Sequence, residues 1–182
     1  MSNIKRIAGF AVGFIIVFLI IQIFSSTDKL PPFKEFRSTE GRFTVLMPGK
    51  PKRERQNADT AVGKVETIMF TAGPRKAVCI VAYSDYPEAL ISRAVPDKVL
   101  DGARDGAVNN INGKLISEKN ISFHGLPARD LQIEIPNKAF VNARLILKSP
   151  RFYQLMFIAP TNKSHEQDIT KFFDSFKIDG VE

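Results

Sequence analysis

The chain has 182 residues, with 26 Lys and Arg against 19 Asp and Glu, a formal net charge of +7 and a single cysteine. One cysteine excludes an intramolecular disulfide, and the basic residues are spread out, without the stripe that nucleic-acid-binding proteins carry, so we expect no nucleic-acid partner. A mild positive charge favours an acidic partner or a place near an anionic membrane surface.

An uninterrupted apolar run at residues 7–24 follows Lys5 and Arg6. As an α-helix it would be about 27 Å long, close to the hydrocarbon thickness of a bilayer. Residues 25–28 match a signal-peptide cleavage site poorly, and no cysteine follows the run, which excludes a lipoprotein anchor. We therefore predict an uncleaved signal anchor at residues 1–24, with a cleaved signal peptide as the alternative.

The two basic residues before this run favour a cytoplasmic N-terminus. We therefore expect a single-pass protein of the cell inner membrane, with its globular domain on the outer, periplasmic face. Residues 25–35 are predicted to be a short linker, stiffened by Pro31 and Pro32. Residues 36–182 are long enough for one domain with its own core.

Most of this domain has the patterns of β-strands. Strands are predicted at residues 42–47, 64–70, 76–83, 115–123, 131–135, 141–147 and 152–158. The segment 76–83 is apolar on both faces, as expected of a central strand that is covered on both sides. Apolar and polar residues alternate in 131–135, which is typical of a half-buried strand.

Two helices are predicted. Pro96 suits a helix start, and apolar residues then share one face as far as Ile111. Ser164 and Gln167 form a capping box, after which apolar residues at helical spacing lead to Phe176. Because helices and strands are segregated, we predict an α+β fold: an antiparallel sheet of about six to eight strands flanked by helices.

Three stretches together resemble the PsbP-like superfamily. They are a strand that ends in a Met-Pro-Gly-x-Pro turn (41–51), a turn leading into a strand (123–130), and the strand 151–155 with the final helix ending at 172–176. The likeness spans residues 36–179 and is greatest to bacterial membrane-anchored or secreted relatives of unknown function. It implies an α-β-α sandwich that acts as a non-catalytic binding or assembly module, with no cofactor.

No constellation of residues points clearly to catalysis or metal binding. Ser84, His124 and Asp130 supply the residue types of a hydrolase, but Ser84 is not in a nucleophile elbow. His124 and His165 lack metal-ligand spacing, and we expect His165 at the surface. Cys79 lies in an apolar run, so we expect it to be a buried hydrophobe.

Two groups of residues are candidates for an interaction patch. A basic cluster in a predicted turn would face lipid head groups or an acidic partner, although the pattern is more typical of a solvated loop; it comprises Lys50, Lys52, Arg53 and Arg55. Aromatic residues beside a carboxylate end the predicted central strand, either as a recognition patch or as core; they are Tyr83, Asp85 and Tyr86. His124 and Arg129 are a candidate turn contact.

The first hypothesis for function is a membrane-anchored module that binds a partner protein or helps a complex to assemble, since a tether raises local concentration. A lipid-binding or small-molecule-binding module is the alternative, and a hydrolase is a distant third. A lipid site needs an apolar pocket, whereas a protein partner needs an exposed apolar or aromatic patch with a charged rim. A hydrolase needs His124 close to Asp130 or Ser84.

Overall fold

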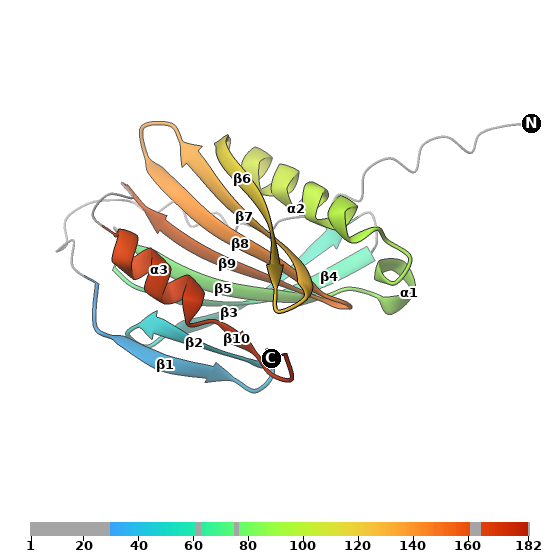
Figure 1. Cartoon of the computed structure of the whole chain (residues 1–182), viewed down its shortest axis with the longest axis horizontal. Helices are drawn as coiled ribbons and strands as arrows, with labels where there is room; N and C mark the ends of the chain where they lie inside the picture. The colour runs from blue at the N-terminus through green and yellow to red at the C-terminus, as the bar shows by residue number, and fades with distance from the viewer. Residues whose placement is uncertain (1–29, 61–62, 75–76, 161–164, 182) are drawn as a thin grey trace, which may run out of the picture.

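The computed structural model describes residues 30–60, 63–74, 77–160 and 165–181 (Figure 1). The predicted signal anchor, its transmembrane helix at about 7–24 and the capping residue Ser164 lie outside these residues. Within the described ranges, no helix is long and apolar enough to cross a membrane.

The described domain is mostly antiparallel sheet, as the α+β prediction requires. Its strands are β1 (Phe33–Ser38), β2 (Phe43–Pro48), β3 (Lys52–Thr60), β4 (Gly63–Ala72), β5 (Val78–Asp85), β6 (Lys114–Phe123), β7 (Leu126–Ile135), β8 (Ala139–Lys148), β9 (Arg151–Ala159) and β10 (Lys177–Ile178). Its helices are α1 (Glu88–Ile91), α2 (Pro96–Asn110) and α3 (Glu166–Asp174).

The strands form a seven-stranded sheet in the order β3-β4-β5-β9-β8-β7-β6 and a three-stranded sheet in the order β1-β2-β10. β5 pairs with β9, with Val81 opposite Leu155. It does not pair with the next strand in the chain, because α1 and α2 follow β5 and β6 then begins at the far edge of the sheet. Every residue of β5 from Val78 to Ser84 is buried, which confirms the predicted central strand.

One face of the large sheet is covered by α2 (Figure 1). The buried residues of α2 lie on one side of the helix, as its apolar spacing predicted; they are Val99, Leu100, Ala103 and Ala107. They pack into an apolar cluster that includes Ile133 and Met156 from the sheet. Because this face is closed by the helix along its middle, it forms one half of the hydrophobic core.

The opposite face is covered by α3 together with the three-stranded sheet, which makes the third layer of the sandwich (Figure 1). An aromatic cluster joins these layers, with ring centroids 5.4 Å apart for Phe43 and Phe176 and 5.7 Å apart for Tyr153 and Phe176. The second flanking layer is therefore a mixture of sheet and helix, where the resemblance implied helices alone.

Several predicted boundaries are corrected by the structure. The linker 25–35 is too long, because β1 begins at Phe33. β3 was not predicted, since charged residues dominate it; it is an edge strand, where charged side chains reach solvent. The N-cap of α3 is His165, which makes no side-chain capping hydrogen bond.

Candidate functional site

A groove of about 360 Å³, lined mostly by polar and charged residues, lies between α3 and the strands β6, β7 and β8. Its lining comes from these four elements and comprises Ser117, Lys119, Asp130, Leu131, Gln132, Asn142, Ala143, Arg144, Ile169, Thr170, Phe173 and Asp174. We call these residues the α3 groove.

The charged centre of the α3 groove is an ion pair between neighbouring strands. Arg144 donates two hydrogen bonds to Asp130, Nε to Oδ1 at 2.7 Å and Nη2 to Oδ2 at 2.8 Å. The hydrogen bonds to Asp130 raise the pKa of Arg144, so the guanidinium stays charged. The Arg144 guanidinium also lies 5.3 Å from the ring centroid of Phe173, which positions an aromatic wall beside the pair.

Side-chain amides line the floor beside this ion pair. Gln132 and Asn142 are cross-strand partners in β7 and β8, and Gln132 Nε2 lies 3.5 Å from Asn142 Oδ1. Lys119 is exposed on the edge strand β6 and adds a positive charge at the rim. The α3 groove therefore offers donors, acceptors and both signs of charge, and its described lining contains neither histidine nor cysteine.

The alternation noted in the sequence is the origin of this groove. Leu131 and Ile133 are buried on the α2 face, so Asp130 and Gln132 point to the other face. Sequence analysis singled out Asp130 only as a possible catalytic acid and did not identify the groove. Polar alternation in two adjacent strands, 130–134 and 142–144, was the signal available for it.

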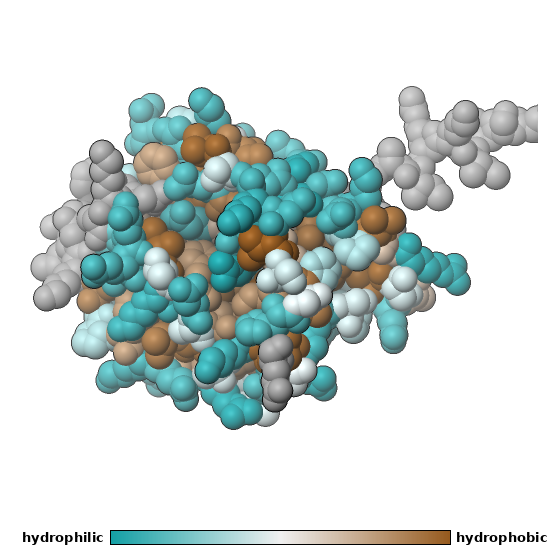
Figure 2. All heavy atoms as spheres, viewed as in Figure 1, coloured by the Kyte–Doolittle hydropathy of each residue, from teal (hydrophilic) through white to brown (hydrophobic). Residues whose placement is uncertain are grey.

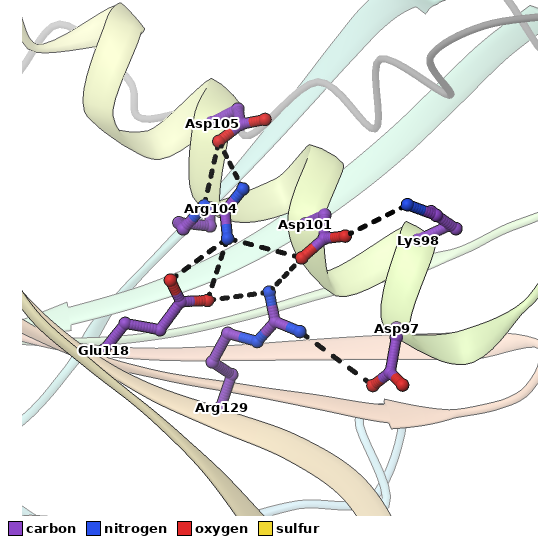
Figure 3. Close-up of polar contacts among 7 residues, drawn as sticks. All are labelled: Asp97, Lys98, Asp101, Arg104, Asp105, Glu118 and Arg129. Atoms are coloured by element: carbon purple, nitrogen blue, oxygen red, sulfur yellow. Dashed lines mark hydrogen bonds and ion pairs between the residues drawn. The ribbon is translucent and has the colours of Figure 1, made fainter.

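A separate charged network joins α2 to the sheet (Figure 3). Arg129 is only 3% exposed, and its Nη1 lies 2.6 Å from Asp101 Oδ1 and 2.8 Å from Glu118 Oε1. Arg104 Nη1 contacts the same two carboxylates, at 3.3 Å and 3.0 Å. Asp97 Oδ1 lies 3.9 Å from Arg129 Nη2. We call these residues the α2 clamp.

The α2 clamp is close to electrically balanced, as expected of a structural contact. The hydrogen bond from Arg129, partly offset by desolvation, holds the pKa of Asp101 below its usual value. Arg129 Nε has no hydrogen-bond partner among the described residues. Asp97, Asp101 and Asp105 recur every four residues in α2, a spacing that signals one charged helix face.

The structure does not bring together His124 and Arg129, the two residues of the candidate turn contact. His124 is exposed in the turn between β6 and β7, where its ring lies 4.8 Å from that of Phe123. Arg129 is five residues further along β7 and points into the α2 clamp. The sequence alone did not show that α2 would lie over this part of β7.

The basic cluster predicted at 50–55 is not a turn, because Lys52, Arg53 and Arg55 belong to β3. Each of the three has a carboxylate partner: Glu54 lies 2.6 Å from Lys52, Glu40 lies 3.0 Å from Arg53, and Glu66 pairs with Arg55. Lys50 is exposed just before the strand. The cations of β3 are thus largely neutralised by their neighbours.

Tyr83 and Tyr86 do not form one patch. Tyr83 packs with the aromatic core on the α3 side, whereas Tyr86 packs with the core on the α2 side. Burial is the main cause that raises the pKa of both hydroxyls, to about 12 for Tyr83. The interpretation of Tyr83 as core is therefore correct, and Tyr86 is core as well.

The structure does bring Arg53, Tyr83 and Asp85 to one place, around two residues that sequence analysis missed. Arg151 donates to both carboxylate oxygens of Asp85 at 2.6 Å, and its guanidinium lies 4.4 Å from the Tyr83 ring centroid. Arg151 Nη1 also donates to the backbone oxygen of Glu40 at 2.8 Å. These contacts tie the β1–β2 turn to the end of the large sheet.

The residue types of a hydrolase have other partners in the fold. Ser84 is buried, with its hydroxyl 2.7 Å from that of Thr67, and Asp130 bonds Arg144. No group of three or more potential metal ligands occurs in the part of the chain that the structure describes.

His165 is buried, not at the surface as predicted, because the start of α3 packs against β9. Its ring lies 5.6 Å from that of Phe157, and its Nδ1 lies 3.3 Å from Asp168 Oδ2. Cys79 is fully buried as predicted, and burial raises the pKa of its thiol.

Comparison with known proteins supports the fold and little else. No protein-family model matches the chain, and no curated protein sequence matches it. The solution structure of cyanobacterial PsbP (CyanoP) from Synechocystis sp. PCC 6803 is similar over 86% of this chain and 98% of that one, with a TM-score of 0.58 and 10% identity. A protein of unknown function, PA94 from Pseudomonas aeruginosa, covers 76% of this chain and 91% of its own, with a TM-score of 0.39 and 12% identity. The similarity to cyanobacterial PsbP shows the PsbP-like fold that the sequence motifs predicted.

Proposed function

We propose that the chain is a membrane-anchored, non-catalytic module of the PsbP-like fold that binds a segment of a partner protein in the α3 groove. The observation that supports this is the composition of the groove, in which two side-chain amides adjoin an ion pair and an aromatic wall. The Gln132 amide can pair with both the N–H and the C=O of a peptide group, and the charges select side chains of a partner.

The lining argues against a lipid as the occupant. An acyl chain needs an enclosed apolar pocket, but most of the residues around this groove are polar or charged. Figure 2 shows hydrophilic and hydrophobic residues interspersed over this face. A small polar solute is the second candidate, since it could use the same donors and acceptors, but an open groove would leave much of it in contact with water.

A membrane anchor would compensate for the weak binding that we expect of an open groove. The apolar run at residues 7–24 is our candidate for a single span, with the domain on the periplasmic face of the inner membrane. A weak contact is sufficient when both proteins share one membrane, because the local concentration of the partner is high. Assembly or maintenance of a membrane complex is the role that we infer.

Site-specific photo-crosslinking in intact cells tests this proposal with the full-length chain. A photoreactive residue replaces Thr170, which is exposed in the groove, and a matched control replaces Lys138, which is exposed in the β7–β8 turn outside it. We expect one protein of defined mass to crosslink at Thr170 and not at Lys138. A lipid adduct at Thr170 would favour the lipid alternative, and the same adducts at both positions would contradict a groove-specific partner.

A charge reversal then asks whether the groove itself recognises that protein. Lys119→Glu should weaken recovery of the crosslinked protein by about tenfold, the equivalent of about 1.4 kcal/mol. Lys114 is also exposed and lies on the same strand, but it is outside the lining, so Lys114→Glu should have little effect. Equal losses of crosslinked protein for the two variants would indicate a general effect of charge and would contradict recognition by the groove.

A further inference from the structure

The chain enters the domain beside the connection between β2 and β3. Gly49 N–H donates to the backbone oxygen of Pro32 at 3.3 Å, and Phe33 is paired with Pro48 in the β1–β2 ladder. The amino group of Lys171 on α3 lies 5.1 Å from the Phe33 ring centroid. Residues 30–34, residues 49–52 and Lys171 thus form one end of the domain, at the start of β1 in Figure 1. We call it the tether end.

The length of the chain outside the described domain limits how far this end can lie from a bilayer. The predicted span ends at Phe24 and the described chain begins at Leu30, so residues 25–29 connect them. Fully extended, this connection reaches roughly 20 Å. The ten-residue strands of the large sheet are each about 33 Å long, so the domain is longer than its tether.

The side chains at the tether end suit an anionic surface. Lys34, Lys50 and Lys171 are exposed, and among the described residues no carboxylate oxygen lies within 4 Å of their amino groups. Lys52 is also exposed there, although Glu54 pairs with it. Lysine stems are long enough to place their ammonium groups among lipid phosphates while the backbone stays outside.

We propose that the tether end lies against the membrane surface and that Lys34, Lys50 and Lys171 contact anionic lipid head groups. This inference rests on the membrane anchor of the proposed function. It places the α3 groove near the membrane surface, because α3 carries Lys171 and also contributes Thr170 and Phe173 to the groove. A partner segment in the groove then lies close to the bilayer, as expected of a partner in the same membrane.

Energy transfer in lipid nanodiscs tests this orientation with the full-length chain. A donor dye is attached to Lys52→Cys at the tether end or, as a control, to Asn120→Cys on the edge strand β6; the native Cys79 is buried and should not react. The acceptor is on the head groups of discs made from phosphatidylcholine and phosphatidylglycerol at about 7:3. We expect clearly higher transfer efficiency from residue 52 than from residue 120.

Charge variants separate lipid contact from simple tethering. Replacing Lys34, Lys50 and Lys171 with Glu should reduce transfer from residue 52, whereas replacing Lys114, Lys138 and Lys177 with Glu changes net charge equally and should not. Equal transfer from residues 52 and 120 in an inserted chain would overturn this inference alone. A chain that does not co-elute with the nanodiscs would overturn the proposed anchor, and this orientation with it.

Discussion

The two faces of the seven-stranded sheet are closed in different ways. On one face, α2 lies across the strands, with Leu100 in the core and the α2 clamp along its border. On the other face, α3 and the three-stranded sheet cover only part of the strands and leave the α3 groove over β6, β7 and β8. The same strands therefore contribute a closed core on one side and an open polar surface on the other.

The two arginines of these faces show what the difference means. Arg129 and Arg144 lie on opposite faces of adjacent strands, and both bind carboxylates. The Arg129 side chain is 3% exposed beneath α2, whereas that of Arg144 is 17% exposed in the groove. Burial makes the first a structural contact, whereas the second reaches solvent in the groove where we propose that a partner binds.

We expect the largest loss of stability from a substitution in the core beneath α2. Leu100→Ala removes a side chain that is 1% exposed, so the free energy of unfolding should fall by roughly 2–5 kcal/mol. Ile169→Ala at the half-buried wall of the α3 groove should cost clearly less, because solvent already reaches that side chain. Urea titration followed by circular dichroism measures both, and equal costs would contradict the contrast between the faces.

The next largest effect is the difference in stability cost between replacing Arg129 and replacing Arg144. Arg129→Met should lower the free energy of unfolding by about 1–3 kcal/mol, because Asp101 and Glu118 lose a buried hydrogen-bond donor. Arg144→Met should cost less, since water can solvate Asp130 once the guanidinium is gone. Urea unfolding of the two variants ranks these costs, and a larger loss for Arg144→Met would reverse our assignment of roles.

The pH dependence of stability sharpens the role of the α2 clamp. The folded pKa of Asp101 is lowered chiefly by the hydrogen bond from Arg129, so its carboxylate stabilises the fold above the unfolded pKa of about 3.9. This contribution is lost as pH falls through the folded pKa. The stability difference between the native chain and Asp101→Asn should be constant from about pH 7 to 5 and shrink below about pH 4. A difference that grows on acidification would show that Asp101 is not stabilised in this way.

The smallest expected effect on stability is in the groove. Lys119→Glu changes an exposed side chain on an edge strand, so the free energy of unfolding should change by no more than about 0.5 kcal/mol. Thermal melting of this variant beside Lys114→Glu checks it. If Lys119→Glu unfolds the domain, its loss of partner binding cannot be attributed to the groove surface.

Much of the secondary structure could be predicted, because alternation and helical spacing are local properties of the chain. Leu131 and Ile133 are buried and Gln132 is half-buried, as their alternation predicted. β5 is buried along both faces, and α2 begins at Pro96. β3 escaped prediction because its position at the sheet edge, where β4 is its partner, is not encoded in its own apolar pattern.

The sequence by itself determined most of the strands, the two amphipathic helices α2 and α3, and the motifs of the PsbP-like fold. Only the tertiary structure decided that Arg129 is buried, that Tyr83 and Tyr86 face opposite layers, and that a groove lies between α3 and the strands β6, β7 and β8. These outcomes depend on contacts between distant residues, such as Asp101 with Arg129, which lie 28 positions apart. A local pattern shows which face of an element is apolar, but the element that covers that face is set by how the whole chain packs.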